Sequence, residues 1–269
     1  LKISIVTISY NQAQFVEQAI RSVIGQDEAS LEYIVVDPGS TDGSRDIIQR
    51  YRDKLAGVIL ERDRGPADGL NIGFAAAKGD IFGFLNADDY LLPGALAKVR
   101  RYFQTHPGID VVSGHGLIVD GSGKIIRRNF SDRFSARMDA LGAASLVQQS
   151  TFFRASALRA AGGFNVENTV AWDGELFFRM HRNGAKFGMI DELLSAWRIH
   201  DSGITGSARL DQRRREYRAR AFREFFGRNP RGLDRMLMVA ARLIKHGRNL
   251  RGVRERLLYG PIYGRARKA

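Results

Sequence analysis

Residues 79–89 read GDIFGFLNADD. A short apolar run, residues 81–85, ends abruptly in an asparagine, an alanine and two adjacent aspartates. Such a run, without polar alternation, is typical of a strand that is buried on both faces of a parallel sheet. In sheets of this kind, ligands bind beyond the carboxyl ends of the strands. The stretch therefore predicts a buried strand that carries Asp88 and Asp89 to a ligand-binding edge.

The segments on either side repeat this strand pattern and alternate with helical patterns. Further strands are expected at residues 3–9, 33–36, 58–60 and 111–113. Apolar residues at helical spacing predict helices over residues 15–23, 47–51 and 70–77, and another that begins near Pro93. This alternation implies an α/β fold with a mainly parallel central sheet flanked by helices. A set of antiparallel hairpins would need two-residue turns, which are absent before residues 120–121.

The composition is that of a globular protein. Of 269 residues, 44% are hydrophobic and 26% are charged, and there is no cysteine. Disulfides, cysteine-ligated zinc and cysteine nucleophiles are therefore excluded. The sequence has no run of about 18 apolar residues, so no transmembrane helix is predicted, and residues 1–10 lack the pattern of a signal peptide. These features permit a cytoplasmic setting.

The charge is distributed unevenly along the chain. Residues 207–269 carry 19 basic and 5 acidic residues, whereas residues 1–206 carry 23 basic and 24 acidic residues. The net charge of +13 therefore belongs to the tail, and the two parts are expected to do different jobs. A basic tail of this kind is attracted to nucleic acid or to an anionic membrane surface.

The expected strand ends collect acidic side chains. Adjacent carboxylates such as Asp88 and Asp89 repel one another unless a cation lies beside them, and Mg²⁺ is typically held by one or two carboxylates together with phosphate oxygens. The alternative is a solvated turn in which Asp89 caps a helix. After the second strand, the turn DPGSTDG at residues 37–43 places Asp37 where it can accept a hydrogen bond from a base or ribose, while Asp42 caps the next helix.

Several ordered motifs resemble those of family 2 glycosyltransferases with the GT-A fold. They are VTISYN at residues 6–11, DPGSTDG at 37–43, ERDRGPADGLNIG at 61–73, GDIFGFLNADD at 79–89, QQSTFF at 148–153, GGF at 162–164 and WDGELFFRM at 172–180. The resemblance spans residues 2–205 and is strongest to bacterial enzymes that build surface polysaccharides. Phosphate-loop, dinucleotide-binding and hydrolase-elbow motifs are absent.

The resemblance implies an inverting transfer from a nucleotide-diphospho-sugar, with a UDP-sugar as the expected donor. Many members carry a second aspartate where this chain has Pro38, which weakens the case for uracil as the base. The residues implied in nucleotide-sugar binding are Thr7, Tyr10, Asn11, Asp37, Asp68, Asn71 and Asp88. Asp89 and His200 are the implied ligands of Mn²⁺ or Mg²⁺, and Asp173 is the implied catalytic base. Gln148, Gln149, Trp172 and Glu175 are the implied acceptor-binding residues.

Each of these roles has a structural alternative. Asp173 can cap the helix that follows it, Trp172 can simply pack in the core, and Gln148 and Gln149 can be amides at the core edge. His200 can belong to a surface loop, and Arg198 can either neutralise a phosphate or pair with Asp191. Two other functions remain open for the whole chain, a nucleic-acid-binding protein that uses the basic tail and a nucleotidyltransferase.

The tail has the pattern of a basic amphipathic helix. Leu233, Met236, Leu237, Ala240, Leu243 and Ile244 form one stripe, and Arg235, Arg242, Lys245 and Arg248 lie on the other side. Such a helix can lie on anionic lipid. We expect a catalytic domain over residues 1–206, with a nucleotide- and metal-binding half (1–115) and an acceptor-binding half (116–206), followed by a membrane-binding tail (207–269). The expected acceptor is a lipid-linked saccharide at the cytoplasmic face of the plasma membrane, and nucleic acid is not an expected partner.

Overall fold

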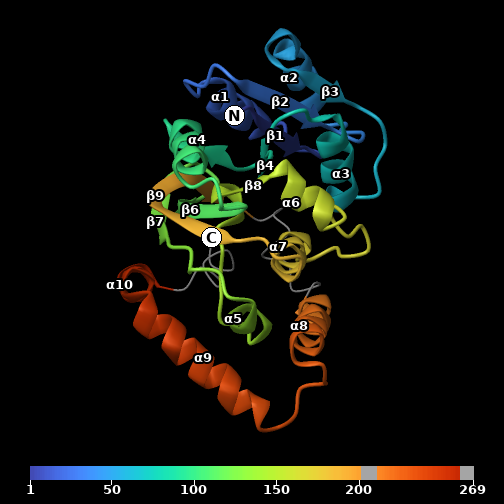
Figure 1. Ribbon diagram of the computed structural model, residues 1–269. Helices are drawn as coiled ribbons and strands as arrows, with labels where there is room; N and C mark the ends of the chain where they lie inside the picture. Colours follow the sequence, from blue (N-terminus) through green and yellow to red (C-terminus); the bar gives the residue numbers. More distant parts are fainter. Residues whose placement is uncertain (201–210, 261–269) are drawn as a thin grey trace.

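The computed structural model describes residues 1–200 and 211–260 (Figure 1). Within these ranges, one nine-stranded sheet has the order β3-β2-β1-β4-β8-β6-β9-β5, and β7 pairs with β6. The strands are β1 (Ile3–Ile8), β2 (Leu31–Val36), β3 (Gly57–Ile59), β4 (Ile81–Asn86), β5 (Tyr90–Leu91), β6 (Val111–Val119), β7 (Ile125–Asn129), β8 (Thr151–Arg154) and β9 (Phe187–Arg198).

Helices cover both faces of this sheet. They are α1 (Val16–Ile24), α2 (Ser44–Arg50), α3 (Pro66–Ala76), α4 (Ala95–Thr105), α5 (Ala136–Ala140), α6 (Ala155–Ala160) and α7 (Trp172–Arg182), with short 3₁₀ turns at η1 (Arg52–Lys54) and η2 (Gln148–Ser150). Side chains of α1, α2 and α4 share one buried cluster with the sheet, and those of α3, α6 and α7 share the other. The predicted α/β fold with helices on both faces is confirmed.

The first half of the sheet is parallel, as predicted. β1 lies between β2 and β4 in parallel register, so that Ile8 stands beside Val36 and Asn86. The carboxyl ends of these three strands therefore meet at one edge. A tight approach of α3 keeps that edge compact, because a Cβ at Gly73 would lie 2.5 Å from the side chain of Val6.

The second half of the sheet is mixed, which the local patterns did not predict. β8 runs antiparallel to both β4 and β6, and β5 runs antiparallel to β9. β6 is longer than the expected strand at residues 111–113, and it turns back into β7 through a loop that Asp120 closes by accepting the N–H groups of Ser122 and Lys124. Strand direction here depends on tertiary pairing, which single-strand patterns do not encode.

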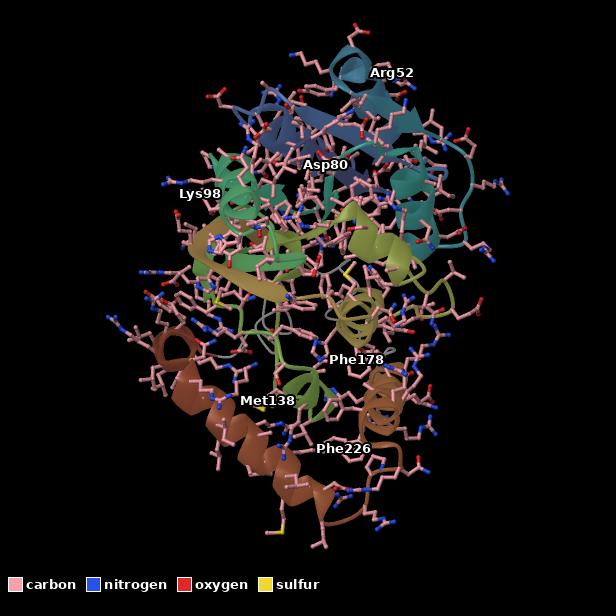
Figure 2. The ribbon with its side chains drawn as sticks, in the orientation of Figure 1. Arg52, Asp80, Lys98, Met138, Phe178 and Phe226 are labelled. Carbon is pink, nitrogen blue, oxygen red and sulfur yellow. The ribbon has the colours of Figure 1, made fainter. Side chains whose placement is uncertain are left out.

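Three helices form the tail: α8 (Asp211–Phe226), α9 (Asp234–Arg248) and α10 (Leu250–Tyr259). α8 packs on α5 and α10 packs on β7, while α9 runs between them along the lower side of Figure 1. Met138 and Phe226, both labelled in Figure 2, pack against a small buried cluster that includes Phe222 and Ala241. The predicted boundary at residue 206 lies outside the described residues.

Candidate active site

The loops after β1 and β2 are tied together by Asn11. Its N–H donates to the Ser40 hydroxyl (2.8 Å), and its side-chain oxygen accepts the N–H of Thr41 (2.9 Å). Asn11 has a φ of 51°, a left-handed conformation that asparagine adopts more readily than most residues. Asn11 therefore shapes this loop and leaves the neighbouring Tyr10 side chain 61% exposed at the sheet edge.

Asp37 holds the turn after β2. Its carboxylate is fully buried and accepts hydrogen bonds from the N–H groups of Gly39 and Ser40, the Ser40 hydroxyl and Arg45. Burial acts to raise the pKa of Asp37, but these hydrogen bonds outweigh it and the pKa lies below its usual value. The structure thus assigns Asp37 to the turn, in contrast to its predicted place on a ligand-facing surface.

Thr7 does not reach the sheet edge, which corrects its predicted role in nucleoside binding. Its side chain is fully buried and accepts a hydrogen bond from the hydroxyl of Tyr33 (2.9 Å). Ser9, two residues further along the same side of the chain, lies just beyond the end of β1. The Ser9 hydroxyl is buried and has no hydrogen-bond partner among the described residues, so Ser9 is the better candidate.

The start of α3 carries two predicted donor-binding residues, Asp68 and Asn71, and both form hydrogen bonds within the protein. Asp68 accepts hydrogen bonds from the backbone and guanidinium of Arg64, and these lower its pKa. Asn71, one turn further on, exchanges two hydrogen bonds with the backbone of Phe164 (2.7 and 2.9 Å). Asn71 is therefore a link between α3 and the loop before α7, and its predicted contact with the nucleotide sugar is not supported.

The structure separates the roles of the two adjacent aspartates after β4. Asp89 is buried, and its oxygens accept hydrogen bonds from the Arg198 N–H (2.9 Å), the Gln149 amide (2.7 Å) and Asn86 (3.3 Å). Burial, with the charge of Asp88 in addition, raises the pKa of Asp89 well above its usual value. The oxygens of Asp89 are thus hydrogen-bonded within the protein, and its part in metal binding stays a prediction.

Asp88 instead faces the other predicted metal ligand. His200 Nε2 lies 3.0 Å from Asp88 Oδ2, and the imidazole packs on the ring of Phe15 (centroids 4.7 Å apart). Two neighbouring ligands of an octahedral ion, each bonded at about 2.1 Å, lie about 3 Å apart. Among the described residues, no group of three or more histidine, aspartate or glutamate side chains surrounds a common point. The 3.0 Å between the two atoms is a hydrogen-bond distance, and it also matches the spacing of two neighbouring ligands of such an ion.

Arg198 fixes the backbone beneath this pair. Its buried guanidinium donates to the carbonyls of Asp88, Asp120 and Gly121 and to the side chain of Gln18. Asp191 pairs with His115 and Arg251 and forms no ion pair with Arg198, and a phosphate contact of Arg198 stays a prediction. Its hydrogen bonds hold the strand-end turn that presents Asp88.

The two glutamines before β8 are buried, as the core-edge alternative predicted. The Gln149 amide donates to Asp89, and the Gln148 amide donates to the carbonyl of Phe84 (3.0 Å). Both nitrogens are thus used within the protein. Gln148 and Gln149 thus support β4 and its acidic turn, and their predicted contact with the acceptor stays a prediction.

Asp173 lies in the first turn of α7 and is half-buried. Burial raises the pKa of its carboxyl above the usual value, against the hydrogen bond from the N–H of Gly174. A carboxylate with a raised pKa is a stronger base, which suits proton removal from a hydroxyl. α8 covers this turn closely, since a Cβ at Gly174 would lie 3.1 Å from the hydroxyl of Tyr217.

A second carboxyl group beside Asp173 was not singled out from the sequence. Burial, and then the charge of Asp173, raise the pKa of Asp139 on α5 to about 7. Its Oδ2 is buried without a hydrogen-bond partner among the described residues. Asp139 therefore keeps its proton to near neutral pH. No local motif marks Asp139, because its burial comes from α7 and α8.

The other two predicted acceptor residues differ in their surroundings. Glu175 is buried and accepts hydrogen bonds from Asn165, Asn168 and Arg220, so it ties α8 to the loop before α7, and its predicted acceptor role is corrected. Trp172 is half-buried against the core cluster on the α3, α6 and α7 side. Its indole N–H has no partner among the described residues, and a contact with the acceptor stays a prediction.

Comparisons with known proteins identify sequence relatives of this chain. Among sequence relatives, an uncharacterized glycosyltransferase of Nostoc sp. is 37% identical over 129 residues (47% of this chain, 40% of the relative). TuaG of Bacillus subtilis, described as a teichuronic acid biosynthesis glycosyltransferase, is 32% identical over 124 residues (45% and 49%). The chain thus matches less than half the length of these two relatives.

Solved structures of low sequence identity share the fold. TarS of S. aureus in complex with UDP-GlcNAc superimposes with a TM-score of 0.69 at 20% identity, over 91% of this chain and 72% of that one. A mannosyltransferase from Pyrobaculum calidifontis in complex with GDP-Man and Mn²⁺ gives 0.64 at 19% identity, over 96% and 73%. The predicted GT-A fold is therefore confirmed.

The family model described as glycosyl transferase family 2 matches residues 4–161. This range contains β1 to β8 and the turn that presents Asp88. Because the match covers more than half of the sequence, the chain belongs to glycosyl transferase family 2.

Proposed function

We propose that this chain is an inverting glycosyltransferase that moves a sugar from a nucleotide-diphospho-sugar to a saccharide acceptor in surface polysaccharide synthesis. The observation that carries the proposal is the Asp88–His200 pair at the edge where β1, β2 and β4 end. The sequence relatives TuaG and ExoU are named for teichuronic acid and succinoglycan biosynthesis, and these names support a polysaccharide product.

Asp88 and His200 would hold Mn²⁺ or Mg²⁺ against the donor diphosphate. A bound divalent ion neutralises the charge that develops on the leaving diphosphate. The other donor contacts are assigned to exposed Tyr10, which can stack on the base, and to the Ser9 hydroxyl at the end of β1. A UDP-sugar is the proposed donor, as in the TarS complex, and GDP-mannose is the comparison compound.

Asp173 is the proposed catalytic base. It takes the proton of the acceptor hydroxyl as the hydroxyl oxygen forms a bond to the anomeric carbon of the donor sugar. The bond from that carbon to the diphosphate oxygen breaks on the opposite side, so the nucleoside diphosphate leaves and the anomeric configuration inverts. A positioned base of this kind contributes roughly 10²–10⁴-fold to the rate.

A panel of nucleotide sugars tests the donor assignment. We expect a UDP-sugar with Mn²⁺ to raise the melting temperature by several degrees, because a ligand at about 100 times its Kd stabilises by about 2.7 kcal/mol. The same compound with EDTA should have little effect. Differential scanning fluorimetry makes the comparison, with free UDP and GDP-mannose alongside. Equal melting temperatures for every nucleotide sugar, with and without Mn²⁺, would reject the proposal.

We also propose that α9 and α10 place the enzyme on an anionic membrane at the cytoplasmic face. Met236, Leu243 and Leu257 are 71%, 66% and 81% exposed, although burial of each against an apolar phase is worth about 1.5–3 kcal/mol. Each arginine or lysine near such a surface adds about 1 kcal/mol. No helix in the described ranges has the length and apolar content to cross a bilayer. A lipid-linked saccharide is the acceptor that this location favours.

Polar substitution of the exposed face tests the membrane proposal. The triple variant Met236→Ser, Leu243→Ser, Leu257→Ser should co-sediment with phosphatidylglycerol vesicles at least tenfold less than the wild type. Its binding of UDP with Mn²⁺ should not change. Leu1→Ser, which alters an exposed aliphatic side chain outside the tail, is the matched control. Undiminished co-sedimentation of the triple variant would refute membrane docking by this face.

A further inference from the structure

A cavity of about 710 Å³ lies between α5, the segment after β7 and the junction of α9 with α10. Met138 lines it from α5, Arg133 lines it from the segment after β7, and Arg248 and Leu250 line it from the tail. None of its lining residues comes from the loops after β1, β2 and β4. The cavity is therefore separate from the proposed donor site, and the tail forms one of its walls.

Two of the cations that line the cavity are paired with its acidic residues. Lys245 lies 3.0 Å from Asp132, and Arg251 lies 2.6 Å from Asp191. His115 also donates to Asp191 (2.9 Å). The lining carboxylates are thus already compensated within the protein and leave no excess negative charge.

Two further cations have no such compensation. Arg133 and Arg248 both line the cavity and neither forms an ion pair with any residue that the structure describes. His115 adds no charge, because its Nδ1 accepts the N–H of Ser131 (3.2 Å) and only Nε2 carries a proton. The cavity lining therefore has a formal charge of +2, which is the complement of a dianion.

The wall of the cavity continues into the exposed apolar face of the tail. Leu250 both lines the cavity and is 69% exposed. From there the exposed side chains of Leu243 on α9 and Leu257 on α10 extend the apolar surface. A ligand that matches both features has a phosphate headgroup on a hydrocarbon chain.

α5 separates this cavity from the proposed base. Met138 lines the cavity, and the next residue, Asp139, interacts electrostatically with Asp173. An α-helix with its side chains is about 10–12 Å wide. A sugar attached to a headgroup in the cavity would therefore have to span about this width to cross α5 towards Asp173.

We propose that this cavity binds the diphosphate headgroup of the lipid-linked acceptor through Arg133 and Arg248, with the hydrocarbon chain along the exposed face of α9 and α10. This inference rests on the proposed function, and it names the acceptor subsite of the same enzyme. It also gives the basic tail a specific task, the recognition of the acceptor, in addition to general attraction to the membrane.

Calorimetric titration of the full chain with geranylgeranyl diphosphate tests the subsite, with EDTA present so that the donor site lacks metal. We expect the double variant Arg133→Ala, Arg248→Ala to bind at least tenfold more weakly than the wild type. Both side chains are exposed and unpaired, so the fold should tolerate the change. Arg242→Ala, which removes the same charge from α9 outside the cavity, is the matched control and should bind like the wild type.

Two partial ligands separate the contribution of the diphosphate headgroup to binding from that of the hydrocarbon chain. Inorganic pyrophosphate and geranylgeraniol should each bind at least tenfold more weakly than geranylgeranyl diphosphate, because each lacks half of the recognised chemistry. A water-soluble short-chain phosphatidylglycerol, which forms no vesicle, should not displace it from the wild type, and displacement would identify a general phospholipid site and overturn the acceptor assignment. An equal loss of affinity for geranylgeranyl diphosphate in Arg242→Ala and in the double variant would show that only net charge matters. That result would also overturn the acceptor assignment.

Failure of this inference is distinguishable from failure of the proposed function. Binding of UDP with Mn²⁺ is measured on the same protein samples. A chain that binds UDP but not geranylgeranyl diphosphate refutes the subsite alone. Asp88→Asn should leave geranylgeranyl diphosphate binding unchanged, and a loss there would show that the lipid diphosphate occupies the donor site and would refute the cavity as its location.

Discussion

The variant Asp173→Asn is expected to lose sugar transfer and to keep donor binding. The amide cannot take a proton from the acceptor, so kcat should fall by roughly 10²–10⁴-fold. Release of nucleoside diphosphate in the presence of a lipid-extracted saccharide acceptor measures the rate, and calorimetry with UDP and Mn²⁺ measures binding. In the wild type, activity should decline towards acid pH as Asp173 gains its proton. Since burial raises the pKa of Asp173, that decline should occur at higher pH than for an exposed aspartate.

Asp139→Asn is the matched control for this experiment. It neutralises the neighbouring carboxyl, which keeps its proton to near neutral pH because burial raises its pKa to about 7. The rate should stay within a few-fold of the wild type, and the acid decline should occur at the same pH, because the Asp139 carboxyl is already mostly uncharged below about pH 7. A full loss of transfer in Asp139→Asn, together with an active Asp173→Asn, would show that Asp139 is the catalytic base and that Asp173 is not.

The variant Asp88→Asn is expected to lose metal-supported donor binding. Removal of the charged oxygen that faces His200 should weaken UDP binding in Mn²⁺ by more than about 100-fold, because loss of a partner that only supports a metal ligand already costs 10–100-fold. Binding in EDTA should be unchanged. Calorimetry under the two conditions separates the metal-dependent part from the rest.

The variant Asp89→Asn tests which of the two adjacent aspartates holds the metal. One amide oxygen can still accept the N–H of Arg198, but the new NH₂ group faces the amide nitrogen of Gln149. The free energy of unfolding should therefore fall by about 1–3 kcal/mol, while the affinity for UDP with Mn²⁺ changes by only a few-fold. Loss of metal-supported UDP binding in Asp89→Asn at an unchanged melting temperature, with normal binding in Asp88→Asn, would show that Asp89 is the metal ligand.

Much of the donor-binding half of the fold could be predicted, because short stretches of its sequence indicate buried strands. The run at residues 81–85 is apolar without alternation, and only a central strand of a layered fold buries both of its faces. The polar residues that follow such runs must then lie at one sheet edge. Register between β1, β2 and β4 confirms this placement. Thr7, which only the resemblance implied, lies within β1 two residues before Ser9, and its side chain is buried.

The assignments within the acidic turn could not be made from sequence. Asp88 and Asp89 are adjacent and chemically identical, and their different roles depend on Arg198 and Gln149, which are distant in the chain. The same applies to Glu175, whose partner Arg220 lies in the tail. Hydrogen-bond partners that are distant in the sequence leave no periodic pattern around the residue that they bind, so local patterns cannot predict them.

One guanidinium holds both the strand-end turn and the β6–β7 hairpin, since Arg198 donates to Asp88 on one side and to Asp120 and Gly121 on the other. The two segments are therefore mechanically coupled. Substitution of Arg198 would therefore remove hydrogen bonds from the turn that carries Asp88 and from the loop of the hairpin at the same time, and both segments would lose order together.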